Sequence, residues 1–423
     1  MSLAEKLNSD SLKTASKIMG HENLNTFQQA DHAVLVKGDC DNIARQEFVK
    51  SLKGKIQNDL LPAVSGAYFS RAMPNYIQEN EAPPADYKEA RKAFQDDPLF
   101  KAYLCINRSS QELQWFSVLD PLEKNIESLE KSVDSIEPCG GSLTLDPNFS
   151  VPKYISSIDI HCMPGGYVGP EGANPLHAGA LYDRGVYLYA MGYMGPYNDD
   201  MGRSVCNYIK RKYPDFQPKR ILDLGCTVGH STLPYAELFP DAEVHGIDVA
   251  ASCLSYGHHR AESMGVPVHF KQANAEETDF EEGSFDLVVS HILLHETSQK
   301  AMPRIFKECH RLLKPGGLMI HADLPPFDNM DAYTQLILDN ETWYNNEPFW
   351  TAMRNADQIQ LSEDAGFNRE DVFFDTAPMA IMEFAASDES YQEEQAEELS
   401  DREFVAGEYA PGGGWEVLVA QKK

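Results

Sequence analysis

A short apolar run that ends in a glycine-containing turn is the segment best suited to hold a ligand. Residues 221–230 read Ile-Leu-Asp-Leu-Gly-Cys-Thr-Val-Gly-His, and a helix-like pattern follows them. Glycine permits a tight bend and a close approach of a ligand to the main chain, and the first turn of the next helix offers free amide donors. The pattern therefore predicts a ligand-binding turn, although a plain strand-to-helix connection also produces it.

An acid at the end of the next strand-like run supports the ligand-binding interpretation. This run covers residues 244–248 and ends in Asp248. Asp248 lies about 20 residues beyond Gly229, where nucleotide-binding folds place a carboxylate that accepts hydrogen bonds from two ribose hydroxyls. The alternative role of such an aspartate is to cap the helix that follows it.

On these residues the sequence resembles the class I S-adenosylmethionine-dependent methyltransferases, especially the small-molecule branch that includes the ubiquinone and menaquinone methyltransferases. The first motif of that family is D/E-x-G-x-G-x-G, and here it reads Asp223, Gly225, Thr227 and Gly229. Thr227 replaces the middle glycine, and its hydroxyl can hydrogen-bond the carboxylate of the methionine moiety. The run Arg-Leu-Leu-Lys-Pro-Gly-Gly at 311–317 matches the turn that leads into the fifth strand of the family.

The resemblance covers about residues 182–325 well and implies S-adenosylmethionine as the cofactor. By position, Asp248 would hold the ribose, and Asn274 and Ala275 would bracket the adenine. Asn274 stands where the family often has aspartate, and its carbonyl oxygen can still accept from the adenine amino group. The expected cofactor-binding set is Asp223, Gly225, Thr227, Gly229, Asp248, Val249, Asn274, Ala275, Ser290 and Tyr187.

Tyr187 belongs to an aromatic segment, residues 182–189, at the place where this family has a lid over cofactor and substrate. Tyrosine rings attract cations, and a sulfonium is one of them. Core packing is the alternative role for any single tyrosine. As a set, the tyrosines predict a largely enclosed, aromatic-lined pocket that excludes water during the reaction.

Methyl transfer from a sulfonium is an in-line displacement, so the protein must align the acceptor and remove its proton where it carries one. His291 and His295 follow the strand at 285–290, at the edge of the sheet where such folds place reacting groups. Imidazole has a reference pKa of about 6.5 and suits general-base work. We expect His291 first, and His295 second, to be the base or an acceptor ligand; a structural role is the alternative for each.

Other polar side chains are expected at the same rim of the sheet. Glu296 follows His295 directly, and His321 and Asp323 end the next strand-like run. A metal site made from the two histidines with Glu296 and Asp323 would require the loop to be helical, so that the side chains share one face. No metal is therefore expected.

The elements that position these residues form an α/β pattern from residue 220 onward. Short β-rich runs alternate with helix-length segments, which is typical of a mostly parallel, doubly wound, Rossmann-like sheet. Seven strands are expected, at 220–224, 243–248, 268–272, 285–290, 317–322, 371–374 and 415–420.

Before the sheet, residues from about 40 to 135 predict helices. Asp41 is expected to cap the first helix, and Pro62 to end or kink it. A helical N-terminal domain at 1–150 would serve as a cap over the site, a homodimer surface or both. The apolar positions expected to face its core are Ile43, Phe48, Val49, Leu52, Ile56, Leu60, Leu113, Trp115, Phe116, Leu119 and Leu122.

Changes of composition mark the remaining boundaries. Residues 139–152 are rich in Gly, Ser, Asp and Pro, which indicates a linker. Residues 151–205 are expected to form the aromatic lid and connector, made of loops and short helices. The S-adenosylmethionine-binding domain would span 206–423, with a solvated acidic insertion at about 387–403.

Composition limits the partners. The 423 residues include 36 basic and 65 acidic side chains, a formal net charge of −29. Such a charge repels nucleic-acid backbones and anionic lipid surfaces, and no basic run interrupts it, so a small-molecule substrate is expected and neither nucleic acid nor a membrane. The charged N-terminus has no apolar core of a signal peptide, and the eight scattered cysteines lack C-x-x-C spacing. We expect a cytoplasmic protein with reduced thiols.

The sequence therefore predicts a methyltransferase that acts on a small metabolite, with the methyl acceptor left open. Two alternatives keep the cofactor without methyl transfer. In one, the altered motif binds S-adenosylmethionine in a regulator or scaffold. In the other, the positive sulfur stabilises developing charge in a lyase or cyclase.

Overall fold

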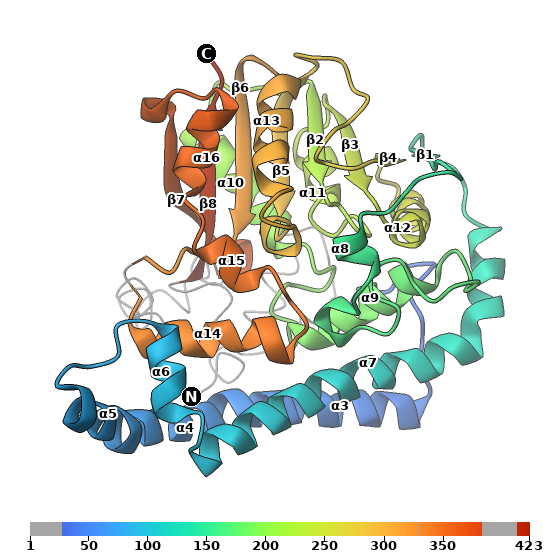
Figure 1. Ribbon diagram of the computed structural model, residues 1–423. Helices are drawn as coiled ribbons and strands as arrows, with labels where there is room; N and C mark the ends of the chain where they lie inside the picture. The colour runs from blue at the N-terminus through green and yellow to red at the C-terminus, as the bar shows by residue number, and fades with distance from the viewer. Residues whose placement is uncertain (1–27, 329, 383–412) are drawn as a thin grey trace, which may run out of the picture.

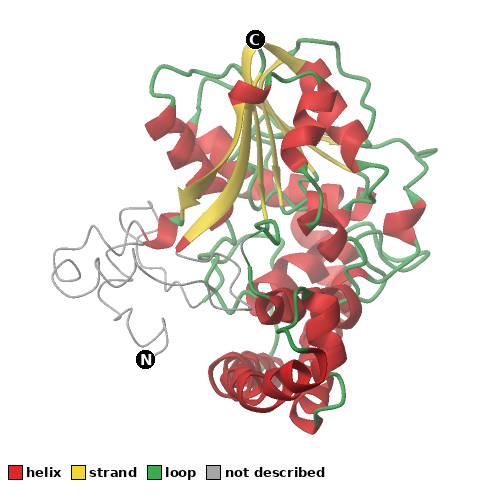
Figure 2. Ribbon diagram, turned by 60° about the vertical axis from the view of Figure 1, so that its left-hand side comes forward, coloured by secondary structure: helices red, strands yellow, loops and turns green. Residues whose placement is uncertain are grey.

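The computed structural model describes residues 28–328, 330–382 and 413–423. Figure 1 shows a twisted sheet with helices on both sides and a layer of long helices beyond one end of its strands. Figure 2 shows the same separation from a second direction, with the strands in yellow and the helical layer below them. The acidic insertion expected at about 387–403 lies outside the described residues.

In the described part of the chain, the sheet has eight strands in the order β1-β4-β3-β2-β5-β6-β8-β7. Every pair is parallel except the two that β8 makes, with β6 and with β7. The strands are β1 Ser142–Thr144, β2 Arg220–Leu224, β3 Glu243–Asp248, β4 His269–Gln272, β5 Phe285–His291, β6 Leu313–Asp323, β7 Val372–Pro378 and β8 Gly414–Gln421.

All seven expected strands are present, and the expected number of strands is one too low. The additional strand is β1, which lies in the segment expected to be a linker and pairs in parallel with β4, with Leu143 opposite Phe270. A strand of three residues has too few positions to show a period of two. Its place is set by main-chain pairing with the edge of β4.

Alternating apolar residues explain why helices cover both faces of the sheet. Ile221 of β2 packs with the helices of one face, and Leu222 and Leu224 pack with those of the other. The first face carries α10 Asp200–Lys212, α11 Leu233–Leu238 and α12 Ala251–Ser263. The second carries α13 Met302–Leu312, α15 Trp350–Arg354 and α16 Gln358–Ala365.

The helical layer begins with a continuous run of helix from Cys40 to Asn80. Asp39, and not Asp41, caps this run, because its side chain accepts from the amide of Asn42 in a capping box. Pro62 neither ends nor breaks the run. It lies in the first turn of an α-helical segment, directly after a π-helical turn that absorbs the shift in hydrogen bonding.

The segments of the layer are α3 Cys40–Lys55, the π-turn η1 Ile56–Leu60, α4 Leu61–Ala67, the π-turn η2 Tyr68–Ala72, α5 Met73–Asn80, α6 Tyr87–Phe94 and α7 Pro98–Val133. Helix α14, Ala332–Tyr344, comes from the C-terminal half and packs among them (Figure 1). Tyr333, Leu336 and Ile337 of α14 share a core with Phe94 and Phe100. The helical layer is therefore not formed by the N-terminal region alone.

Four apolar positions expected in the core of this layer are exposed: Ile43, Phe48, Leu113 and Phe116. Helix α3 instead turns Asn42, Gln46 and Val49 inward. Gln46 donates to the carbonyl of Ser117 at 3.0 Å, and Asn42 donates to Asp120 at 3.1 Å. Polar contacts with α7 set the orientation of α3. The spacing of the apolar residues along α3 does not reveal these contacts.

The aromatic segment expected as loops and short helices contains the 13-residue helix α9, His177–Tyr189. Its glycines lower the helical signal of the sequence. They are needed because α9 lies between two other helices: a Cβ on Gly179 would lie 2.3 Å from Tyr256 of α12, and one on Gly185 would lie 2.1 Å from Trp115 of α7. Two short elements precede it, α8 Lys153–Ser156 and η3 Ile160–Cys162; two further 3-10 turns, η4 Leu294–Glu296 and η5 Arg369–Asp371, follow β5 and precede β7.

Candidate active site

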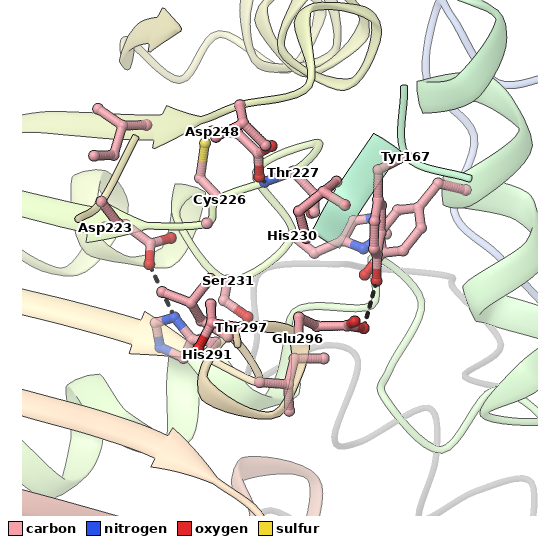
Figure 3. Close-up of a pocket in the computed structure, with 18 of the residues that line it drawn as sticks. Tyr167, Asp223, Cys226, Thr227, His230, Ser231, Asp248, His291, Glu296 and Thr297 are labelled. Carbon is pink, nitrogen blue, oxygen red and sulfur yellow. Dashed lines mark hydrogen bonds and ion pairs between the residues drawn. The ribbon is translucent and has the colours of Figure 1, made fainter. Parts of the chain in front are cut away.

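A pocket opens at the carboxyl ends of β2, β3, β4 and β5, and α9 closes one side of it. The space between its lining atoms, counted out to the mouth, is about 1050 Å³. Figure 3 shows Asp223 and His291 on one side of this pocket and Tyr167 and Glu296 on the other.

The turn after β2 forms one wall. Gly225 has a φ of +71°, and a Cβ there would lie 2.6 Å from the side chain of Leu293. Thr227 has a φ of +44°, in the left-handed region that a β-branched residue rarely adopts. Its amide donates to Oδ2 of Asp248 at 3.0 Å, and its hydroxyl is a hydrogen-bond partner of Tyr182. These contacts hold the threonine in a conformation that glycine adopts without strain.

Asp248 ends β3 beside this turn, as expected. Its Oδ1 accepts from the amide of Ala250 at 2.8 Å, and its Oδ2 accepts from Thr227. Burial raises the pKa of this carboxyl to about 6, although the main-chain amides oppose that shift. Each carboxylate oxygen retains a lone pair for a further donor, because an ionised carboxylate can accept about four hydrogen bonds.

Asp223 lines the pocket, but its carboxylate has partners within the protein. Oδ2 accepts from the hydroxyl of Thr232 at 2.6 Å, and Oδ1 lies 3.2 Å from Nδ1 of His291. Thr232 directly precedes α11, so Asp223 connects the end of β2 to the start of that helix. Its role is to hold the turn and the histidine in place.

His291 also lines the pocket, and both of its ring nitrogens have partners. Besides Asp223, the hydroxyl of Tyr235 lies 3.1 Å from Nε2. His295 does not line the pocket: its Nδ1 lies 2.6 Å from Oδ1 of Asp323, and its ring packs against Trp350. These contacts favour a structural role for both histidines.

The expected convergence of three histidines on one rim is wrong. The ring of His321 turns away and packs on Phe306 of α13, and its Nδ1 lies 2.6 Å from Oγ of Ser290. Burial lowers the pKa of His321 to about 4. His291 and His295 likewise approach different acids, Asp223 and Asp323. Across the described ranges, no group of three or more His, Cys, Asp or Glu side chains is arranged to hold a metal ion.

Most of the expected cofactor set surrounds the pocket, and three members do not. Those that line it are Asp223, Gly225, Thr227, Asp248, Val249, Asn274 and Ala275. Ser290 is fully buried against His321, and Tyr187 is buried with its ring under the guanidinium of Arg184. Gly229 does not reach the pocket either, and turns the chain with a φ of +78°. Among the tyrosines, Tyr154, Tyr167 and Tyr182 take the place expected for Tyr187.

The sequence placed Glu296 at this rim, but it gave no sign of the contacts that Glu296 makes. Its Oε1 accepts from the hydroxyl of Tyr167 at 2.9 Å and lies 2.9 Å from Nε2 of His161 (Figure 3). The other ring nitrogen of His161 lies 2.9 Å from Oε1 of Glu347. Because His161, Glu296 and Glu347 come from distant parts of the sequence, no spacing revealed this cluster. The only signal was the position of Glu296 after β5.

His230, in the turn between β2 and α11, links the pocket to the start of the described chain. It lines the pocket, and its Nε2 lies 2.8 Å from Oδ1 of Asp183 on α9. The same carboxylate accepts from Tyr256 at 2.7 Å and lies 2.9 Å from Nε2 of His32. Burial alone would raise the pKa of Asp183, but His230 and His32 hold it well below its usual range.

Comparison with known proteins agrees with this geometry. Residues 221–317 match the family model described as a methyltransferase domain. The demethylmenaquinone methyltransferase of Thermus thermophilus is 36% identical over 109 residues, which cover 26% of this chain and 49% of that protein. The domain around the pocket belongs to the class I S-adenosylmethionine-dependent methyltransferase superfamily.

Two further comparisons show how far the similarity extends. A methyltransferase of Synechocystis without an assigned substrate is 32% identical over 149 residues, which cover 35% of this chain and 66% of that protein. A crystal structure of Haemonchus contortus phosphoethanolamine N-methyltransferase 2 matches 60% of this chain and 61% of that chain, with 19% identity and a TM-score of 0.40. The chain thus spans about half to two thirds of the length of these methyltransferases.

S-adenosylmethionine is the cofactor of this domain, and the residues present fit it. Asp248 is held by two main-chain amides with lone pairs left for further donors, such as hydroxyl groups, and Asn274 and Ala275 line the same pocket. The side-chain oxygen of Asn274 accepts from the amide of Glu276 at 3.0 Å, which fixes its orientation. No helix in the described part of the chain has both the length and the apolar character to cross a bilayer.

Proposed function

We propose that this protein transfers a methyl group from S-adenosylmethionine to a small-molecule acceptor. The observation that carries the proposal is the placement of Asp248 and the turn at Gly225 and Thr227 on one wall of a pocket whose opposite wall carries Glu296 and Tyr167. One wall suits the methyl donor, and the other offers polar and aromatic groups to a second molecule. A small acceptor is favoured because helix α9 and the loop at 160–167 cover the pocket.

The contacts of the histidines bear on proton removal. His291 is the histidine within the pocket, but a base must have a nitrogen free to face the acceptor. Both nitrogens of His291 already have partners, Asp223 and Tyr235. We therefore assign His291 to holding the turn, and His295 to supporting the loop that carries Glu296.

Calorimetry with S-adenosylhomocysteine tests the cofactor assignment. The wild-type protein is expected to bind it with 1:1 stoichiometry, and Asp248→Ala is expected to weaken binding by about 1–3 kcal/mol, because hydrogen-bond partners of the ribose are lost. Unchanged affinity in Asp248→Ala would contradict the ribose assignment. Asp286→Ala, at the opposite end of the sheet, is the matched control.

Methyl transfer is tested separately, with S-adenosylmethionine labelled in the methyl group and a small-molecule extract of the source organism. Label in an extract metabolite supports the proposal. Persistent absence of label, together with binding of S-adenosylhomocysteine, would favour the regulator or scaffold. Turnover of an acceptor with the labelled cofactor intact would favour the lyase or cyclase.

Assembly and location form a second part of the proposal. The N-terminal helices support one wall of the site from behind: Gln111 and Trp115 of α7 donate to the carbonyl of His161 at 3.1 and 2.6 Å, and His161 pairs with Glu296. The exposed side chains of Phe48 and Phe116 on α3 and α7 support a homodimer through the outer surface of these helices. Light scattering of the purified protein and of a Phe48→Ser/Phe116→Ser variant tests the homodimer.

All eight cysteines are free thiols, which supports a cytoplasmic location.

A further inference from the structure

The charged groups of the pocket are all of one sign. Its lining includes the carboxylates of Asp223, Asp248 and Glu296, and the described residues that line it include no lysine or arginine. An anionic acceptor, such as a carboxylate or a phosphate, would meet these acids without a counter-charge. A cationic acceptor would be attracted to them, and more strongly than in water because the surroundings are buried.

Two of the three carboxylates already have assigned partners. Asp223 binds Thr232 and His291, and Asp248 accepts from two main-chain amides and faces the proposed ribose site. Glu296 differs from both. Its Oε1 has partners, but its Oε2 is buried and has no hydrogen-bond partner, and the whole residue is 6% exposed. An acceptor oxygen without a donor in such a place is costly, so a ligand that supplies the donor is favoured.

Glu296 is ionised and held in place. Burial alone would raise the pKa of Glu296, but His161 and His295 hold it below its usual range. His161 bridges Glu296 and Glu347, and its own main chain has a φ of +57°. Gln111 and Trp115 of α7 fix that main chain through its carbonyl. The helical layer thus fixes His161, and His161 fixes the carboxylate before a ligand arrives, which lowers the cost of binding.

Aromatic rings surround the same part of the pocket. The rings of Tyr167 and Tyr182 lie with their centroids 5.6 Å apart, and both line the pocket together with Tyr154. Ring faces attract ammonium groups, and they bind organic cations best where water is excluded. A carboxylate with tyrosines beside it is therefore a binding site for an organic ammonium ion.

We propose that the methyl acceptor is an amine and that Oε2 of Glu296 binds its ammonium group. This inference rests on the proposed methyltransferase function. The ammonium donates a hydrogen bond to Oε2, and bound amine that has released one proton to solvent carries a lone pair on nitrogen. That pair forms the new N–C bond to the methyl carbon of the donor as the C–S bond breaks and its electron pair stays on sulfur. The products are the N-methylammonium ion, which Glu296 again pairs with, S-adenosylhomocysteine and the proton released to solvent.

The test uses full-length protein saturated with S-adenosylhomocysteine and three probes of one shape: benzylamine, benzyl alcohol and benzoate. Ligand-observed NMR and calorimetry at pH 7 measure their affinities. We expect benzylamine to bind at least about tenfold more tightly than benzyl alcohol, because it adds a charge-assisted hydrogen bond, and benzoate to bind least. Equal affinities for the amine and the alcohol, or a preference for benzoate, would overturn the proposal.

Two glutamine variants separate ligand binding from a structural role. Glu296 and Glu347 both pair with His161, but of these two glutamates only Glu296 lines the pocket. Glu296→Gln is expected to remove the preference for benzylamine, while Glu347→Gln is expected to retain it. If Glu296→Gln does not fold, the relative affinities of the wild-type protein for benzylamine, benzyl alcohol and benzoate still test the proposal. Retention of the preference in a folded Glu296→Gln protein would overturn the proposal.

A further arm separates this inference from the proposed function. Failure of the wild-type protein to bind S-adenosylhomocysteine would remove the proposed function, and this inference with it. If the cofactor binds and labelled methyl groups reach oxygen, sulfur or carbon of the acceptor, the methyltransferase function stands and the amine is wrong. An affinity for S-adenosylhomocysteine about tenfold weaker in Glu296→Gln, with no amine preference in the wild type, would assign Glu296 to the donor and also overturn the proposal.

Discussion

The main-chain amide of Thr227 donates to Oδ2 of Asp248 across 3.0 Å, so the residue that departs from the glycine motif also orients the proposed ribose-binding acid. Any residue except proline at position 227 could make this hydrogen bond, because it uses the main-chain amide. The departure therefore leaves the cofactor site intact, and its cost is the left-handed conformation of a β-branched residue.

Thr227→Gly is the first prediction. Glycine adopts a φ of +44° without strain, and this gain is partly offset by the greater freedom of glycine in the unfolded chain and by loss of the hydrogen bond to Tyr182. We expect a net increase of about 1 kcal/mol in the free energy of unfolding. Urea unfolding measures it. Thr227→Ser, which retains both the hydroxyl and a Cβ, is the control; a stability gain equal to that of glycine would show that the backbone is not strained.

The second prediction concerns the pH dependence of cofactor binding. The pKa of Asp248 is raised to about 6, and the ionised carboxylate is the form that accepts from ribose hydroxyls. The dissociation constant of S-adenosylhomocysteine should be constant above pH 7 and should rise below pH 6, by at most about tenfold per pH unit. Calorimetry between pH 5 and 8 measures it. In Asp248→Asn this dependence should vanish; if it persists, another group is responsible.

The third prediction concerns stability in acid. The pKa of buried His321 is lowered to about 4, so the unfolded chain binds a proton here more readily than the folded one. This histidine contributes its full stability above about pH 6.5, and that contribution falls by up to about 3 kcal/mol as the pH falls to 4. Urea unfolding of wild type and His321→Asn at several pH values isolates it. Parallel pH profiles of the two proteins would contradict the lowered pKa.

The fourth prediction concerns His291. Removal of the ring takes the histidine partner from Oδ1 of Asp223 and from the hydroxyl of Tyr235, while Oδ2 of Asp223 keeps Thr232. We expect His291→Ala to lower the free energy of unfolding by about 2 kcal/mol or more, with a parallel loss of cofactor affinity because Asp223 holds the turn. Thermal unfolding and calorimetry measure both. A protein of native stability with normal cofactor affinity and little turnover would instead identify His291 as the base.

The fifth prediction follows from the contacts of Asp183. His32 reaches this carboxylate from near the start of the described chain, and His230 reaches it from the pocket. His32→Ala should therefore weaken the binding of S-adenosylhomocysteine severalfold, although residue 32 lies outside the pocket. Lys37→Ala, an exposed position in the same segment, is the control. Equal affinity in both variants would limit His32 to a local role.

The sequence predicted the sheet well because its strands are apolar runs with clear ends, and β2 and β3 have the expected bounds. For the same reason it placed Asp223, Thr227 and Asp248 together, because each lies at or just after a strand end, and all three line the pocket. The opposite wall could not be predicted. Glu296, His161 and Glu347 meet only through the tertiary fold, and the burial of Ser290 depends on the face to which it points.

The face of a helix was equally hard to predict where polar contacts decide it. Phe48 and Phe116 fit an apolar period, yet hydrogen bonds from Asn42 and Gln46 turn α3 the other way. Helix α9 was obscured by Gly179 and Gly185, which its close packing requires. In both cases the residues that determine the packing lie on another helix, so they do not appear in the sequence of the segment itself.

Strand β1 has a practical consequence for anyone who wishes to trim this protein. Residues 142–144 precede the family-matched region by about 75 positions, yet they form the outer border of its sheet beside β4. A shortened version that starts near residue 206 would leave the main-chain groups on the outer edge of β4 without partners, although β3 still pairs with its inner edge, and an open strand edge pairs readily with other chains. Such a fragment should precipitate or self-associate, and a version that retains residues from 139 onward should do so less.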